Sequence, residues 1–172
     1  MVALVARLAQ ARIGTTFNQY AASPLLRERL VGYLEERRSA AVVLVGEAAG
    51  YRGARVSGIA FTSERQLTGA GPAEATATIV HRVLTELGIA DEVLLWNLVP
   101  THPHRPGDAS SNRRPTLGEV RAARPFLDTL GHGRRVIPVG RLAHVALGGT
   151  YVRHPSHGGA AGFRAGVRAA LS

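Results

Sequence analysis

The chain has 172 residues, a net charge of +9, and neither cysteine nor lysine. A chain of this length suffices for one domain with one core. The missing cysteine excludes disulfides, thiolate zinc sites, iron–sulfur clusters and a cysteine nucleophile, and the missing lysine excludes a Schiff-base mechanism. The 21 basic residues, all arginine, either form a solvated surface or bind a polyanion such as nucleic acid.

The apolar stretches of the sequence are short. No apolar run is long enough to cross a bilayer, and arginines interrupt the apolar N-terminus, which therefore lacks a signal-peptide core. We expect a single domain over residues 1–172, in the cytoplasm and without a membrane partner.

Helix and strand patterns alternate along the chain. Ser23 before Pro24, and Thr116 three residues before Glu119, are helix-start signals. Helices are predicted over residues 3–12, 24–38, 71–88, 116–130, 141–147 and 160–170, and strands over 40–45, 92–96, 135–140 and 150–153. Strands separated by helices imply right-handed crossovers, so we expect an α/β fold with three αβα layers and a central four-stranded parallel sheet. Ligands of such sheets bind beyond the carboxyl ends of the strands.

The segment after the first strand, "GEAAGYRGARVSGIAF" (46–61), is rich in glycine. Small residues let the backbone approach a ligand, but a purely structural turn fits equally well. The segment matches no recognised phosphate-loop pattern. Glu47 is the only carboxylate in the turn, and Phe61 is by default a core aromatic residue.

The segment after the second strand, residues 96–116, is long for such a connection, and long ordered loops are usually functional. Asn97, at the end of the strand, either caps the loop backbone or reads a planar heterocycle, because an amide both donates and accepts. Arg113 and Arg114 are predicted phosphate contacts or simply exposed charges. His102 and His104 have no obvious third ligand beside them, so no metal is expected.

The segment "RHPSHGGAAGF" (153–163) follows the fourth predicted strand. His154 is either structural or catalytic. Backbone amides of the serine and glycines at the start of the next helix would form a phosphate cradle.

Taken together and in order, these segments resemble the motifs of the uracil-DNA glycosylase superfamily, over roughly residues 40–170. "GEAAG" resembles the first motif of the family, in the "GEAPG" version that some bacterial branches carry. "SGIAF" resembles the family segment that ends in a phenylalanine, which stacks on the base. "LLWN" resembles the strand that ends in the uracil-binding asparagine. "NRRPTLGEVRAARPFL" and "HPSHGG" resemble two further motifs, the second of which enters the minor groove of DNA.

The resemblance implies a monofunctional DNA glycosylase of base excision repair, which hydrolyses the N-glycosidic bond of uracil or a related deaminated base flipped out of DNA. It implies that Phe61 stacks on the base, that Asn97 reads it, and that His154 stabilises the charge of the departing base. Glu47 is the candidate for positioning the water, because Ala48 stands where other branches carry aspartate or asparagine. The alternative for Glu47 is that it caps backbone amides of its turn.

The resemblance also implies a substrate pocket and a DNA-binding surface. Gly50 stands where the strictest uracil enzymes carry a tyrosine that blocks a 5-methyl group, which leaves room for 5-substituted uracils or hypoxanthine. The missing cysteines imply a branch without the iron–sulfur cluster, and we expect a monomer without cofactor or metal, associated with a bacterial nucleoid. The implied pocket residues include Gly46, Ala48 and Gly50, and the implied DNA contacts are Arg113, Arg114, Pro155, Ser156, His157 and Gly158.

Two other functions remain open. Ala48 motivates a non-catalytic protein that binds damaged DNA, or one that captures it covalently through His102 or His104. A nucleotide- or cofactor-binding α/β domain is the third possibility, against which the missing phosphate-loop pattern counts.

Overall fold

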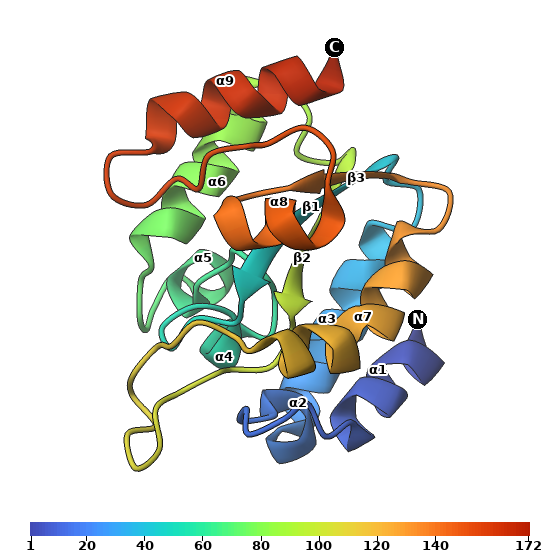
Figure 1. Ribbon diagram of the computed structural model, residues 1–172, viewed down its shortest axis with the longest axis vertical. Coiled ribbons are helices and arrows are strands. Elements are labelled where there is room, and N and C mark those ends of the chain that lie inside the picture. Colours follow the sequence, from blue (N-terminus) through green and yellow to red (C-terminus); the bar gives the residue numbers. More distant parts are fainter.

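A computed structural model describes all 172 residues and has a parallel sheet between two layers of helices (Figure 1). The sheet consists of β1 (Val42–Ala48), β2 (Val93–Val99) and β3 (Arg135–Pro138), in the order β2-β1-β3. The register sets Gly46 of β1 beside Asn97 of β2. The predicted αβα architecture with a parallel sheet is therefore confirmed.

The predicted fourth strand is reduced to one parallel bridge between Val139 and Val152. The amide of Val152 donates to the carbonyl of Pro138 (3.2 Å), and the amide of Gly140 donates to the carbonyl of Val152 (2.8 Å). Gly148 and Gly149, both with positive φ, precede the bridge, and Pro155 follows it closely. This leaves few residues that can pair as a strand, since proline has no amide hydrogen to donate.

The longer helices follow the predicted pattern. They are α1 (Val2–Gln10), α3 (Pro24–Glu36), α6 (Ala75–Glu86), α7 (Leu117–Gly131), α8 (Arg141–Leu147) and α9 (Ala160–Leu171). The expected start of α6 near residue 71 is wrong, because Gly71 has a φ of +78° and the turn extends to the N-cap residue Glu74. Three helices of four or five residues were not predicted, since they are too short to show a period: α2 (Gln19–Ala22), α4 (Ala54–Ser57) and α5 (Glu64–Thr68).

Strand β1 separates two hydrophobic clusters, because its side chains alternate between the two faces of the sheet. On one face, Val43 and Val45 pack in a cluster with residues of α1, α3, α7 and α8. On the other face, Val42 and Leu44 pack in a cluster with residues of α6 and α9. Helices therefore cover both faces of the sheet, as is usual for parallel sheets.

The predicted capping box starts α7. The Thr116 hydroxyl accepts from the amide of Glu119 (3.2 Å), and the Glu119 carboxylate accepts from the amide of Thr116 (2.9 Å). The same carboxylate accepts two bonds from the Arg113 guanidinium, at 2.6 and 2.8 Å. Mainly because of Arg113, the pKa of Glu119 falls to about 2. This buried ion pair anchors the 96–116 loop to α7.

No helix of the protein has both the length and the apolar character needed to cross a membrane.

Candidate active site

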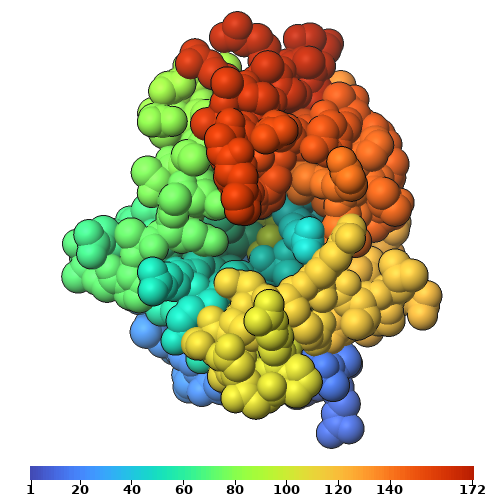
Figure 2. Space-filling model, turned by 60° about the vertical axis from the view of Figure 1, so that its left-hand side comes forward, coloured from blue at the N-terminus to red at the C-terminus, as the bar shows by residue number.

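A cavity lies beyond the carboxyl ends of β1 and β2. Figure 2 shows the hollow among the segments after the strands and those around residues 60–80. The structure brings together four side chains that the sequence analysis selected from separate segments, Glu47, Phe61, Asn97 and His154. The complete lining is Glu47, Ala48, Gly50, Ala54, Phe61, Glu74, Thr76, Asn97 and His154.

Gly46 lets two of these side chains reach the end of the sheet. A Cβ atom at Gly46 would lie 2.8 Å from Oδ1 of Asn97 and 2.8 Å from Cε2 of Phe61. Asn97 and Phe61 are only 5% and 8% exposed. The absence of a side chain at Gly46 therefore lets an amide and an aromatic ring lie against the same point of β1.

Asn97 lies in the cavity with its hydrogen-bonding capacity free. Its side chain makes no hydrogen bond within the protein, so the alternative role of capping the loop backbone is not observed. The amide faces the cavity, so both its donor and its acceptor are available to a ligand. A ligand with a complementary donor and acceptor would satisfy it.

Phe61 is held in an unusual backbone conformation. Its φ is +52°, in the left-handed region that side chains other than glycine rarely adopt. The hydroxyl of buried Ser57 fixes the segment by donating to the carbonyl of Thr62 (2.7 Å) and accepting from the amide of Ile59 (3.1 Å). Strain of this kind concentrates at functional sites, where it fixes a side chain in one place.

His154 presents a hydrogen-bond donor. Its Nδ1 lies 2.8 Å from the Ser156 hydroxyl and accepts from the amide of Ser156 (3.3 Å), so in the neutral ring the proton is on Nε2. Burial, with a smaller contribution from His157, lowers the pKa of His154, which keeps the ring neutral near pH 7. The ring lies 6.3 Å from that of Phe61, measured between centroids.

Glu47 is half-buried in the cavity, and burial raises the pKa of its carboxyl while the charge of Arg114 opposes the shift. No backbone amide donates to the Glu47 carboxylate, so the alternative of a backbone cap is not observed. Ala48 also lines the cavity and contributes only a methyl group.

Glu74 was missed by the sequence analysis. It precedes α6, and its carboxylate lines the cavity beside Gly50 and Gly53. Burial raises the pKa of this carboxyl as well. No motif marks Glu74, because its position depends on how the turn over residues 69–74 folds back.

The loop over residues 153–159 borders the cavity on another side. Pro155 is buried, while His157 and Gly158 are exposed. His157 has a φ of +50°, so this loop also contains a strained residue other than glycine. The Ser156 hydroxyl contacts His154, which gives Ser156 a positioning role besides the predicted contact with phosphate.

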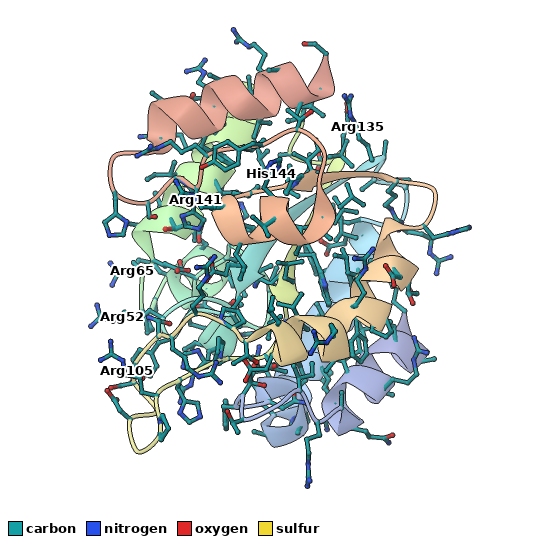
Figure 3. The ribbon with its side chains drawn as sticks, in the orientation of Figure 1. Arg52, Arg65, Arg105, Arg135, Arg141 and His144 are labelled. Carbon is teal, nitrogen blue, oxygen red and sulfur yellow. The ribbon has the colours of Figure 1, made fainter.

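The arginines of the site fall into two groups. Arg113 is bound to Glu119, so its guanidinium has a structural role and is not free to make the predicted phosphate contact. Exposed arginines that form no ion pair include Arg114, whose charge acts on Glu47, and those labelled in Figure 3 as Arg52 and Arg105, which point outward on the same side of the molecule.

The histidines of the 96–116 loop do not form a metal site. His102 is buried and its Nδ1 donates to the carbonyl of Ala49 (2.8 Å), while its ring stacks on that of His104 at 5.9 Å. No three histidine or acidic side chains gather closely enough in the structure to hold a metal ion.

A parallel αβα sheet with such a cavity at its strand ends defines an α/β protein built to bind a ligand there. The sequence model of the uracil DNA glycosylase superfamily matches residues 33–165. The chain therefore belongs to the uracil DNA glycosylase superfamily, and its membership supports a function of the DNA glycosylase type.

Among solved structures, the chain is similar to wild-type SMUG2 of Pedobacter heparinus, with a TM-score of 0.70 and 12% sequence identity. The similarity covers 99% of this chain and 96% of that one, and it shows a common fold over the whole chain. No curated protein matches the sequence.

Proposed function

We propose that this protein is a monofunctional DNA glycosylase that hydrolyses the N-glycosidic bond of uracil, or of a related deaminated base, flipped out of DNA. The observation that carries the proposal is the convergence of Asn97, Phe61, Glu47 and His154 on one cavity. Enzymes that act on a base must take it out of the stack, and a pocket with an aromatic wall and an unpaired amide suits an extruded base.

Asn97 would read the base. Its Oδ1 would accept from N3–H of uracil and its Nδ2 would donate to O4, while Phe61 stacks on the ring. Cytosine carries an acceptor at N3 and a donor at C4, so it cannot satisfy the same arrangement. A site built on such a bond rejects the mismatched base strongly, because the buried amide is left unpaired.

His154 and Glu47 would perform the chemistry. As the bond from C1′ of the sugar to the base breaks, its electron pair leaves with the base, and Nε2–H of His154 would stabilise the charge on O2. Water then attaches to C1′ and gives up a proton to Glu47, whose raised pKa suits a general base. The departed base anion then takes a proton from solvent and Glu47 releases its proton to solvent, so the products are a free base and an abasic site. The chain has no lysine that could form an imine with the sugar.

The DNA strand would be held by the exposed arginines and by the 153–159 loop. A net charge of +9 favours the phosphate backbone without regard to sequence. We propose that the protein acts as a monomer, with Arg114, His157 and Gly158 among its DNA contacts.

The test is release of free base from duplex oligonucleotides, each with a single uracil, hypoxanthine, xanthine or 5-hydroxymethyluracil, measured by chromatography and by alkali-sensitive strand cleavage. The wild-type protein should release uracil, and Asn97→Ala, Glu47→Gln and His154→Ala should each lose most of this activity. Glu92→Gln and His132→Ala, which change exposed residues, are the matched controls.

Ala48 favours one second candidate, a protein that binds damaged DNA without cleaving it, because this position offers no group to hold water. Tight binding of uracil-containing DNA without release of any base would support that function and contradict ours. A protein–DNA adduct on a denaturing gel would show covalent capture instead.

A further inference from the structure

Glu74 is a carboxylate of the cavity to which the proposed reaction assigns no part. It is the N-cap residue of α6, yet its side chain accepts no hydrogen bond from the helix. Its carboxylate has no ion-pair partner and lines the cavity instead. Glu74 is half-buried, and its carboxylate makes no hydrogen bond or ion pair that would explain it as a structural residue, so it is free to contact a ligand in the cavity.

The carboxylate fills space that two glycines leave open. A Cβ atom at Gly50 would lie 3.1 Å from Oε1 of Glu74, and one at Gly53 would collide with Oε2. Gly50 itself lines the cavity. Glu74 therefore forms the wall of the cavity at the position where a side chain of residue 50 would otherwise stand.

The proposed orientation of the base indicates which atom faces this wall. With N3 and O4 on Asn97 and O2 toward His154, the ring position beside O4 and away from O2 is C5. Among the polar side chains that line the cavity, Glu74 and Thr76 take part neither in these two contacts nor in the proposed reaction, and Glu74 is the one that lies beside Gly50.

We propose that Glu74 is a specificity-determining residue, whose carboxylate accepts a hydrogen bond from a hydroxyl group carried on C5 of the extruded pyrimidine. This inference rests on the proposed function of the same site. Uracil has only a C–H at C5, and the methyl group of thymine would desolvate the carboxylate without bonding to it. A 5-hydroxymethyl group offers the donor that the carboxylate lacks.

A purine suits this wall less well. Its N7 is an acceptor, as is a carboxylate, so the two would repel each other. Activation of water is a different role for Glu74, and it predicts a different result, because losing the water activator slows the release of every base by the same factor.

The experiment compares three duplexes that differ only at C5 of one base opposite guanine, namely uracil, thymine and 5-hydroxymethyluracil. Single-turnover rates of base release are measured for the wild type, Glu74→Ala, Glu74→Gln and the control Glu92→Gln. Glu74→Ala should lower the ratio of the 5-hydroxymethyluracil release rate to the uracil release rate at least tenfold. This corresponds to a loss of about 1.4 kcal/mol in the difference between the two activation free energies. Glu74→Gln, which keeps an acceptor oxygen, should fall between Glu74→Ala and the wild type.

Equal losses for uracil and 5-hydroxymethyluracil in Glu74→Ala would overturn the inference, and so would an unchanged ratio. Since the ratio is measured within one protein sample, partial unfolding of a variant does not alter it. If the wild type releases none of the three bases, the inference fails, and the proposed function fails with it unless hypoxanthine or xanthine is released. If the wild type is active and only the ratio is insensitive to Glu74, the inference alone fails.

Discussion

Gly46→Ala should disable the site without changing any of the side chains proposed to act in it. The added Cβ would lie 2.8 Å from Oδ1 of Asn97, whereas ordinary contacts begin at 3.4 Å, so the amide must move by about 0.6 Å. The ring of Phe61 must move farther, because its Cζ comes closer still. The backbone of Gly46 does not have positive φ, so alanine introduces no conformational strain there.

Displacements of this size have a known cost. A misplacement of about 1 Å lowers the rate of an enzyme by about 100-fold, so we expect Gly46→Ala to lower single-turnover release of uracil by 10- to 100-fold. Gly32→Ala is the matched control, because Gly32 lies within α3 and a Cβ there would contact nothing within 4 Å. That change should leave the rate as it is and stabilise the protein by about 0.5–1 kcal/mol. A Gly46→Ala protein as active as the wild type would refute our account of how Asn97 and Phe61 are positioned.

Three further predictions concern charge. Because the pKa of Glu119 is lowered to about 2 from 4.5, mainly by Arg113 and further by the amides of Thr116 and Thr15, its ionised carboxylate should contribute about 3 kcal/mol to the free energy of unfolding above pH 5, lost as the pH falls toward 2. Urea unfolding at a series of pH values should show a shallower acid loss in Glu119→Gln, and an identical loss would contradict this role. The rate of base release should fall as the pH is lowered through the pKa of Glu47, which lies above 4.5, because only the ionised carboxylate accepts a proton. Glu47→Gln should lack this acid limb, and a pH profile parallel to that of the wild type would exclude Glu47 as the base. Replacing both Arg52 and Arg105 by serine should reduce the slope of log affinity against log salt concentration by about 2, whereas an unchanged slope would place both outside the DNA interface.

Much of the site could be predicted from the sequence because parallel strands end at the same edge of a sheet. Asn97 directly follows a short apolar run, which predicts a buried strand. Glu47 comes one residue after a second apolar run of the same kind. Neighbouring parallel strands bring the residues at their carboxyl ends together, whatever conformation the connecting loops adopt. His154 lies shortly after the residue of the bridge that replaces the fourth strand, so its position was also predictable, although the strand itself was not formed in full.

Other features depend on contacts between segments, which no local pattern encodes. Arg113 was predicted to contact phosphate, but the bend of its loop turns it toward Glu119, the residue of the capping box. Glu74 enters the cavity because the turn before α6 folds over Gly53, a relation between positions 21 residues apart. The left-handed backbone of Phe61 likewise depends on the hydrogen bonds of Ser57 and could not be read from the motif around it.

The most direct test of the proposed function is the rate of uracil release by Asn97→Asp, measured in single turnover beside the wild type. The substitution keeps the size of the side chain and replaces the donor proposed for O4 of uracil by an acceptor. Our account predicts that uracil release falls at least tenfold and that the preference for uracil over cytosine shrinks. Release of uracil at the wild-type rate, with the preference intact, would show that Asn97 does not read the base.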